Sequence, residues 1–399
     1  MTLYPFRKLT RLKLKFLLLL LIIACLAFPL PGASAAVKPG TACSKVGTMA
    51  LYKSSILTCK KSGSKNIWFS PGVISQTQIS KFISATRPTT FGNLYKYRKG
   101  IPVAAWSNFN KYASILDNPI EGVEIFIGAN TKPWYLTPLD AVKKVRNSFP
   151  KIDFPKHFVF IYYSFDDQSW AKDKLVSLVT SNDYENFYRN EGGRVIDSNC
   201  DNLVKDCQGA KALTAQDGTG FLLIGVPGAI DAGDQTATYR LQTGMLEAHE
   251  YFHTLQDVPF SGKNLEGVDW PPRWAIEGGA EFIQNAAINN ASFAKYLDFR
   301  SLDGKELYQQ SHIYTSRYIN DYLTRSNSSD SSFMDYYLGS RVIEILVALK
   351  GQTSLLALNE ALATRIGFSA AFESVYGYPW SKAIPVIAKV IAAGIQEEK

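Results

Sequence analysis

The sequence predicts an α+β fold, because short β-rich runs come first and segments with helical periodicity follow. Residues 123–127 alternate like a half-buried strand. Residues 158–163 and 221–226 are short apolar runs of the kind that forms buried strands. From residue 236 onward the apolar positions recur at helical spacing. We therefore expect a sheet followed by a largely helical C-terminal part.

The helical segments have recognisable limits. Residues 138–147 form the first, with Thr137 as a candidate N-cap. The later ones are 236–256, 272–289, 333–350, 353–363, 367–375 and 379–395. Pro272 stands at the start of one of them, where proline is tolerated. Residues 190–220, which contain Gly192-Gly193 and Asp217-Gly218, are expected to be loop.

The chain of 399 residues is long enough for two or three domains, and 46% hydrophobic with 20% charged residues is ordinary for a globular protein. Residues 37–70 are expected to form a small basic module that contains two cysteines. Residues 71–100, rich in Ser, Thr, Gly and Pro, are expected to form a linker with a short helix. Residues 101–399 are expected to form the main domain.

Residues 1–36 are typical of a secretory signal peptide. A basic stretch precedes an apolar run, residues 16–28, that is too short to span a bilayer comfortably. Ala33-Ser34-Ala35-Ala36 then offers small residues for cleavage. An uncleaved anchor is one alternative, and a lipoprotein attached at Cys25 is another. We favour a released, secreted chain over one that stays associated with the cell envelope.

Four cysteines follow residue 36, and an even number in an exported chain indicates disulfide bonds. Proximity along the chain favours the pairs Cys43–Cys59 and Cys200–Cys207. Zinc binding by these cysteines is the competing interpretation. It is weaker, because the cysteines form no CxxC pair and no histidine lies near either pair.

Positive charge is concentrated on the N-terminal side of the chain. The net charge is +8, yet residues 37–116 carry twelve Lys and Arg and no acidic residue, while all 35 acidic residues lie from Asp117 onward. This pattern favours contact with an anionic cell-wall polymer or membrane surface as much as it favours a solvated face. Nucleic acid is not expected as a partner, because the chain is exported and shows no recognisable nucleic-acid-binding fold.

The candidate chemistry centres on His249-Glu250-Tyr251-Phe252-His253, an HExxH motif. Side chains four positions apart share one face of a helix, so both imidazoles can face one metal ion. Glu250 can take a proton from a water molecule held there. The surrounding helix is largely apolar, and a metal is the simplest reason to bury two histidines and a glutamate together.

A second segment, residues 274–281, supplies carboxylates. Glu277 follows His253 by 24 residues, enough for a loop and the start of an antiparallel helix. Two histidines and one glutamate would leave an open position, as catalytic zinc sites do. Glu281 lies one turn later and could accept a hydrogen bond from a liganding histidine. An exposed acidic pair is the alternative. Gly278 and Gly279 are poor helix residues and indicate close packing against the HExxH helix.

These segments resemble the gluzincin branch of zinc metallopeptidases, which includes thermolysin-like enzymes and the large aminopeptidase family. The resemblance rests on His249-Glu250-x-x-His253 and Trp274-x-x-Glu277-Gly278-x-Ala280. It implies a zincin-like catalytic domain with a sheet over the HExxH helix. It also implies one Zn²⁺ held by His249, His253 and Glu277, with Glu250 as general base acting on a peptide or protein substrate. No exopeptidase motif of the Gly-Ala-Met-Glu-Asn kind precedes the HExxH.

Tyr336-Tyr337-Leu338-Gly339 resembles the Tyr-x-x-Gly segment that supplies an oxyanion-stabilising tyrosine in the aminopeptidase group. The resemblance implies Tyr336 as that donor. A core tyrosine is the alternative, and His312, Tyr314 and Tyr337 are the other candidate donors. His157, which precedes a strand, is interpreted as structural.

Two further questions stay open at this stage. In zincins an edge strand before the HExxH helix pairs with extended substrate, and residues 221–226 could be that strand or a fully buried one. The chain could also be a non-catalytic cell-envelope binding protein on the same scaffold, with residues 37–116 as its working part. A structural zinc site would need a fourth protein ligand.

Overall fold

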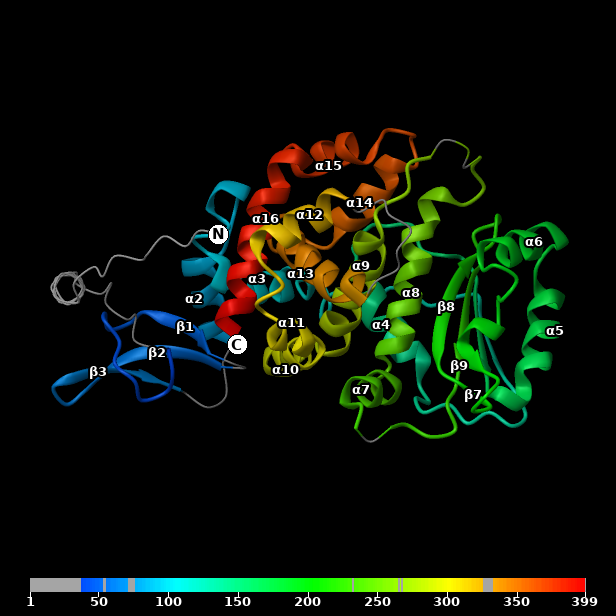
Figure 1. Cartoon of the computed structure of the whole chain (residues 1–399), viewed down its shortest axis with the longest axis horizontal. Helices are drawn as coiled ribbons and strands as arrows, with labels where there is room; N and C mark the ends of the chain where they lie inside the picture. Colours follow the sequence, from blue (N-terminus) through cyan, green and yellow to red (C-terminus); the bar gives the residue numbers. More distant parts are fainter. Residues whose placement is uncertain are drawn as a thin grey trace, which may run out of the picture. The chain divides into compact units, whose positions relative to one another are not determined.

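The computed structural model describes residues 37–52, 55–70, 76–231, 233–264, 266, 268–325 and 333–398. The expected signal peptide, residues 1–36, lies outside them. The described chain divides into two compact units, a small one of residues 37–52 and 57–70 and a large one that contains the rest. The fold is mixed α+β, as predicted (Figure 1).

The small unit is a three-stranded sheet in the order β1 (Met49–Tyr52), β2 (Ser55–Ser62) and β3 (Lys65–Phe69). Strands β2 and β3 are antiparallel, with Cys59 opposite Trp68. The predicted disulfide Cys43–Cys59 is present. It joins a core cluster whose buried members are Leu57, Cys59 and Trp68, which is small enough to need a covalent cross-link.

The sheet of the large unit has four strands in the order β4-β5-β9-β8. The three predicted strands are β4 (Val123–Ile127), β5 (Phe158–Tyr163) and β9 (Gly220–Gly225), and they run parallel to one another. The fourth strand, β8 (Gly209–Thr214), pairs antiparallel with β9 and forms the edge. Strand β9 is therefore a fully buried inner strand, which is one of the two alternatives that the sequence allows.

Strand β8 falls within the segment that the sequence assigns to loop, and that assignment is wrong for residues 209–214. Its sequence, Gly-Ala-Lys-Ala-Leu-Thr, has little intrinsic preference for a strand. The strand forms because it pairs with β9 along its whole length, from Gly209 opposite Gly225 to Thr214 opposite Gly220. A local sequence pattern does not indicate pairing with another segment of the chain.

Helices cover both faces of this sheet (Figure 1). Helices α5 (Gln168–Leu178) and α6 (Ser181–Asn190) place Ala171, Leu175 and Phe187 in a core cluster with side chains of β5, β8 and β9. Helix α8 (Met245–Asp257), which carries the HExxH motif, packs on the other face against β8 and β9. The sequence thus correctly predicts a sheet over this helix.

The predicted helix 236–256 is two helices rather than one. Helix α7 (Gln235–Thr243) ends at Gly244, whose φ is +84°, and α8 starts at the next residue. Glycine adopts this left-handed conformation without steric cost. A side chain at Gly244 would also collide with the ring of Tyr135, so the break is fixed by both conformation and packing.

Residues 76–100, which the sequence assigns to a linker, are part of the large unit. They form α2 (Gln76–Thr86) and two short 3₁₀ turns, Phe91–Asn93 and Arg98–Gly100, that lead into α3 (Ile101–Phe109). Apolar residues that anchor this segment are buried, among them Ile79, Phe82, Phe91 and Leu94. The large unit therefore begins before residue 101. Burial of these few apolar side chains holds the segment in the unit, although most of the residues around them are polar.

The remaining helices follow α8 along the chain, with the exception of α4 (Pro138–Arg146), which comes between β4 and β5. The helices that the sequence predicts are α4, α9 (Arg273–Ile288), α13 (Phe333–Lys350), α14 (Thr353–Leu362), α15 (Phe368–Tyr376) and α16 (Trp380–Glu398). Three others are additional: α10 (Phe293–Asp303), α11 (Lys305–Gln309) and α12 (Ser316–Thr324). Among the described helices none alone is long and apolar enough to cross a membrane. The pair α13 and α14 passes that test together but is bent by 103°.

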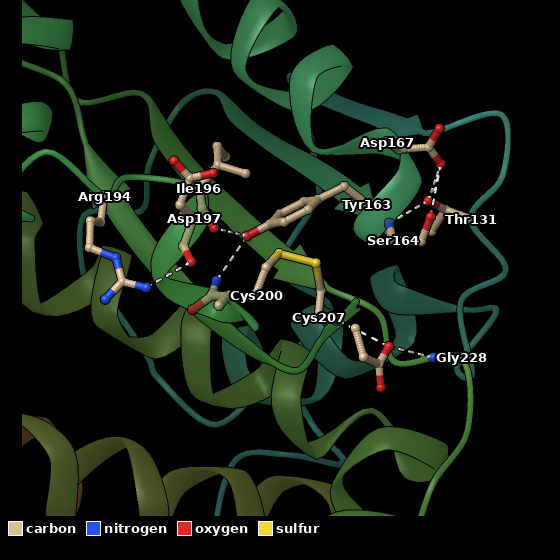
Figure 2. The surroundings of a disulfide bond; sticks show 12 residues. Thr131, Tyr163, Ser164, Asp167, Arg194, Ile196, Asp197, Cys200, Cys207 and Gly228 are labelled. Carbon is tan, nitrogen blue, oxygen red and sulfur yellow. Dashed lines mark hydrogen bonds between the residues drawn. A yellow bond between two sulfur atoms is a disulfide. The ribbon is translucent and has the colours of Figure 1, made fainter. Parts of the chain in front are cut away.

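The second predicted disulfide, Cys200–Cys207, closes a two-residue ladder of β6 (Cys200–Asp201) and β7 (Asp206–Cys207) just before β8 (Figure 2). The neighbouring residues are tied down as well. Tyr163 at the end of β5 donates its hydroxyl to the carbonyl of Ile196, and the Asn199 amide donates to that hydroxyl. The chain that enters the edge strand β8 is thus held against the sheet.

Helices α9 and α13 cross at a pair of glycines. A Cβ on Gly278 would overlap the backbone of Gly339, and a Cβ on Gly339 would lie 2.6 Å from the carbonyl oxygen of Trp274. The two helix backbones touch at this crossing, so only glycine fits at positions 278 and 339. The sequence predicts close packing of Gly278 and Gly279 against the HExxH helix. This is confirmed for Gly279, where a Cβ would lie 3.0 Å from Gln256 and 3.2 Å from Phe252 of α8, but Gly278 packs against α13 instead.

We expect Gly339→Ala to lower the free energy of unfolding by roughly 1–3 kcal/mol or more, since two helix backbones must move apart. Gly394 in α16 is the matched control, because a Cβ there would meet nothing within 4 Å. Gly394→Ala should raise stability by up to about 1 kcal/mol through its better helix propensity. Denaturant unfolding measures both. Equal stability of the two variants would contradict the assigned crossing.

Candidate metal centre

Three predicted ligands meet where α8 and α9 pack together. The Oε2 atom of Glu277 lies 3.6 Å from Nε2 of His249 and 3.5 Å from Nε2 of His253. One ligand atom from each residue falls within 4.8 Å of the others. Within the part of the chain that the structure describes, this is the one such group of His, Cys, Asp or Glu side chains. Two imidazole nitrogens and one carboxylate oxygen suit Zn²⁺.

The ring of His253 is oriented by a residue one turn later on the same helix. Its Nδ1 lies 2.7 Å from Oε1 of Gln256. The amide nitrogen of Gln256 donates to the carbonyls of Ala275 and Ile276 on α9, at 3.3 and 3.1 Å. The amide oxygen must therefore face His253 and accept its Nδ1 proton. This leaves Nε2 to face Glu277 and a metal ion.

The ring of His249 is backed by Glu281, which is only 2% exposed. The Nδ1 atom of His249 lies 3.7 Å from Oε2 of Glu281, and that oxygen has no other hydrogen-bond partner among the described residues. The distance is longer than a hydrogen bond, so the structure shows the two groups facing each other rather than bonded. The predicted position of Glu281 behind a liganding histidine agrees with this geometry.

A partly buried arginine, whose side chain is 25% exposed, holds Glu281 in turn. One terminal nitrogen of Arg240 donates to Oε1 of Glu281 at 2.6 Å and to Oδ1 of Asp303 at 3.0 Å. Gln284 also donates to Oε1 of Glu281. Burial, together with the charge of Glu281, raises the pKa of Asp303 to about 8. Arg240 and Gln284 therefore occupy Oε1 of Glu281 and leave Oε2 for the histidine.

Glu277 is held on its other side by Arg273 at the start of α9. The Oε1 atom of Glu277 lies 3.4 Å from a terminal nitrogen of Arg273, whose Nε donates to Asp335 at 3.3 Å. Burial alone would raise the pKa of Glu277, but the two imidazoles that face it, His249 and His253, hold it below its ordinary value. A permanently ionised carboxylate with one oxygen turned to the imidazoles suits a cation.

Burial alone would lower the pKa of His253, but the facing carboxylate of Glu277 raises it to about 9. In the absence of metal the Nε2 position of His253 therefore carries a proton at neutral pH. The carboxylate that retains this proton would also attract a metal cation, which would take the proton's place. The residues present thus fit a metal ion both in geometry and in charge.

Glu250 lies beside this group and is buried, with 5% of its surface exposed. Burial raises the pKa of its carboxyl, and so does the charge of Glu277. The charges of both histidines and a hydrogen bond from the backbone of Ala212 act in the opposite direction. Ala212 belongs to the edge strand β8, so the carboxylate of Glu250 lies near this edge of the sheet.

Tyr336 is the aromatic residue of α13 that reaches the metal ligands. Its ring lies roughly parallel to that of His249, with 6.0 Å between centroids. Burial raises the pKa of Tyr336 above its ordinary value, and the charge of Glu277 and a hydrogen bond to it add to the effect. The hydroxyl therefore stays protonated and able to donate at neutral pH.

The other candidate donors lie elsewhere. Burial raises the pKa of Tyr337, and the charge of Asp303 adds to this effect while Arg240 opposes it. Tyr314 packs edge-on against Tyr318, and His312 is exposed. His157 pairs with Glu124 at 3.1 Å, which agrees with a structural role.

Sequence reasoning missed the residues that orient the ligands. Gln256 could have been found, since it lies one turn after His253 on the same helix. Arg240 and Asp303 could not, because they lie on α7 and α10 and meet Glu281 only in the folded chain. No family model, curated protein or solved structure matches this chain. The gluzincin resemblance therefore rests on its motif residues.

We expect one Zn²⁺ per mature chain, measured by elemental analysis after dialysis, and none in His253→Ala. Gln256→Leu should keep the stoichiometry but weaken zinc binding about 10- to 100-fold, because His253 loses the acceptor that orients it. Competition with a chromophoric chelator measures the affinity.

The matched control is Gln396→Leu on α16. This variant removes a side-chain amide that donates to the carbonyl of Ser311 at 2.7 Å. Its zinc affinity should equal that of the wild type. Unchanged affinity in Gln256→Leu would show that this amide does not orient the ligand. Zinc bound by His253→Ala would contradict the ligand assignment itself.

Proposed function

We propose that this chain is a zinc-dependent peptidase that hydrolyses peptide bonds with a water molecule activated by Glu250. The observation that carries the proposal is the convergence of His249, His253 and Glu277 beside a buried Glu250. When bound there, Zn²⁺ would supply Lewis-acid polarisation of a carbonyl and a lowered pKa for water.

Glu250 is the proposed general base. Because burial raises the pKa of its carboxyl, the carboxylate is a stronger base than an exposed glutamate. It would accept a proton from the attacking water and later deliver that proton to the leaving amine.

Tyr336 is the proposed donor to the oxyanion that forms when water adds to the peptide carbonyl. Its hydroxyl is held at Glu277, beside the ligand set, and it stays protonated. A positioned hydroxyl stabilises negative charge more strongly in the transition state than in the substrate. Arg273 also lies near this hydroxyl and lowers its pKa in part.

Strand β8 is the proposed binding edge for the substrate backbone. It ends the four-stranded sheet, and no other strand among the described residues pairs with its outer side. An extended peptide could add there as a further strand through backbone hydrogen bonds. Because Ala212 of β8 contacts Glu250, a peptide on this edge would lie beside the catalytic carboxylate.

Export of the mature chain is part of the proposal. Two disulfides, Cys43–Cys59 and Cys200–Cys207, are typical of proteins that fold in an oxidising compartment. The signal-like residues 1–36 agree with this. The substrate would then be a peptide or protein outside the cytoplasm.

We expect Glu250→Gln to bind zinc as the wild type does and to lose turnover by roughly 10²- to 10⁴-fold or more, since an amide cannot accept the water proton. Elemental analysis and cleavage of a mixed peptide library measure the two properties. Full turnover in this variant would place the base elsewhere. A wild type that holds zinc but cleaves nothing would favour the non-catalytic binding protein.

Tyr336→Phe should slow cleavage by roughly 10²-fold with zinc content unchanged, because it removes a single oxyanion donor. Tyr337→Phe is the matched control, since Tyr337 is the next residue on the helix. A large loss in Tyr337→Phe and none in Tyr336→Phe would show that the donor assignment is wrong.

A further inference from the structure

The small unit carries positive charge with nothing inside it to neutralise that charge. Residues 37–70 contain six lysines and no Asp, Glu or Arg. Five of these lysines, Lys38, Lys45, Lys60, Lys61 and Lys65, belong to the described residues, and all five are exposed. Since the unit has no carboxylate, only an anion from outside it can pair with them.

The rest of the basic segment differs in this respect. Arg98 pairs with Glu397 on the C-terminal helix, and Lys99 lies 3.9 Å from the same carboxylate. Part of the positive charge of residues 71–116 is thus balanced within the large unit. Residues 37–70, by contrast, contain no acidic residue that could balance any of their positive charge.

The lysines at the end of the β2–β3 hairpin lie on both of its faces. Cys59 and Trp68 are paired on the core face, so the next pair, Lys60 with Ile67, lies on the opposite face. Lys61 with Asn66 returns to the core side, and Lys65 opposite Ser62 again shares the face of Lys60. The charge therefore surrounds the hairpin end and does not lie in one plane.

An exposed aromatic ring accompanies these charges. Phe69 on β3 is 43% exposed, and the Nζ of Lys60 lies 4.2 Å from its ring centroid. The contact keeps this ammonium over the ring and near the surface. The absence of arginine matters too, because lysine offers a point charge and guanidinium a fixed two-pronged geometry. Such a surface suits repeated phosphates of no fixed orientation.

We propose that the small unit, residues 37–70, binds a flexible linear polymer with repeated phosphodiester groups, and so holds the secreted chain at an anionic envelope. A polymer can wrap a hairpin end that is charged on both faces. A flat bilayer would meet the lysines of one face only, and Val46 and Phe69 are the exposed large apolar side chains that the described unit offers to it. This site is independent of the proposed metal centre.

The test uses the full mature chain and poly(glycerol phosphate) as the probe, with binding followed by titration from about 50 to 200 mM salt. The triple variant Lys60→Ser, Lys61→Ser, Lys65→Ser should bind at least ten-fold more weakly at the lowest salt. Its plot of log affinity against log salt should be shallower by about 2, on the order of 0.7 for each lysine removed.

Three controls separate the explanations. The triple variant Lys156→Ser, Lys305→Ser, Lys382→Ser removes the same charge from exposed lysines of the large unit and should bind like the wild type. The triple variant Lys60→Arg, Lys61→Arg, Lys65→Arg keeps the positive charge and should retain binding. This result would show that the serine variant loses affinity through lost charge and not through misfolding. Glu250→Gln should also bind normally, because the polymer site does not depend on hydrolysis.

Equal losses in the two serine triple variants would overturn the assignment to the hairpin, because net charge alone would then explain binding. Failure of the wild type to bind the polymer would overturn the proposal. So would tighter binding to vesicles of equimolar phosphatidylglycerol and phosphatidylcholine, or to single-stranded DNA, than to the polymer. Polymer binding without peptide cleavage would leave this inference intact and count against the peptidase alone.

Discussion

The candidate site depends on the contact between Gly278 and Gly339. Glu277 and Tyr336 lie on different helices, and they meet because α9 and α13 approach until their backbones touch at these glycines. Tyr336 lies three positions before Gly339, so the tyrosine is one turn from the crossing on the same helix face. A wider crossing would carry the hydroxyl away from the carboxylate and leave the ligands without their neighbour.

The surroundings of the ligands show how a buried site is kept rigid. Each histidine has a partner behind its ring, Gln256 for His253 and Glu281 for His249. Each partner is held in turn by groups from other elements: the carbonyls of α9 hold Gln256, and Arg240 of α7 holds Glu281. Side chains that are already fixed would lose little conformational entropy on metal binding, so the free energy of binding would be reduced little by ordering them.

Sequence reasoning predicted features that depend on short spacings and missed features that depend on distant pairing. The approach of His249 and His253 follows from their i and i+4 positions on one helix, and the long C-terminal helices follow from periodicity. Strand β8 was missed because Gly209–Thr214 has no strand pattern of its own and is formed by β9. The split at Gly244 was missed because helical periodicity continues across it, although the backbone does not.

All three ligands come from α8 and α9, which are neighbours along the chain, whereas Tyr336 arrives from α13, 59 residues after Glu277. During folding, contacts between segments close in sequence form with less loss of chain entropy than those between distant ones. A partly folded chain in which α8 and α9 have paired already possesses every ligand atom. Under the proposed function, metal loading would therefore need only the pairing of α8 and α9, whereas the oxyanion donor would also need α13.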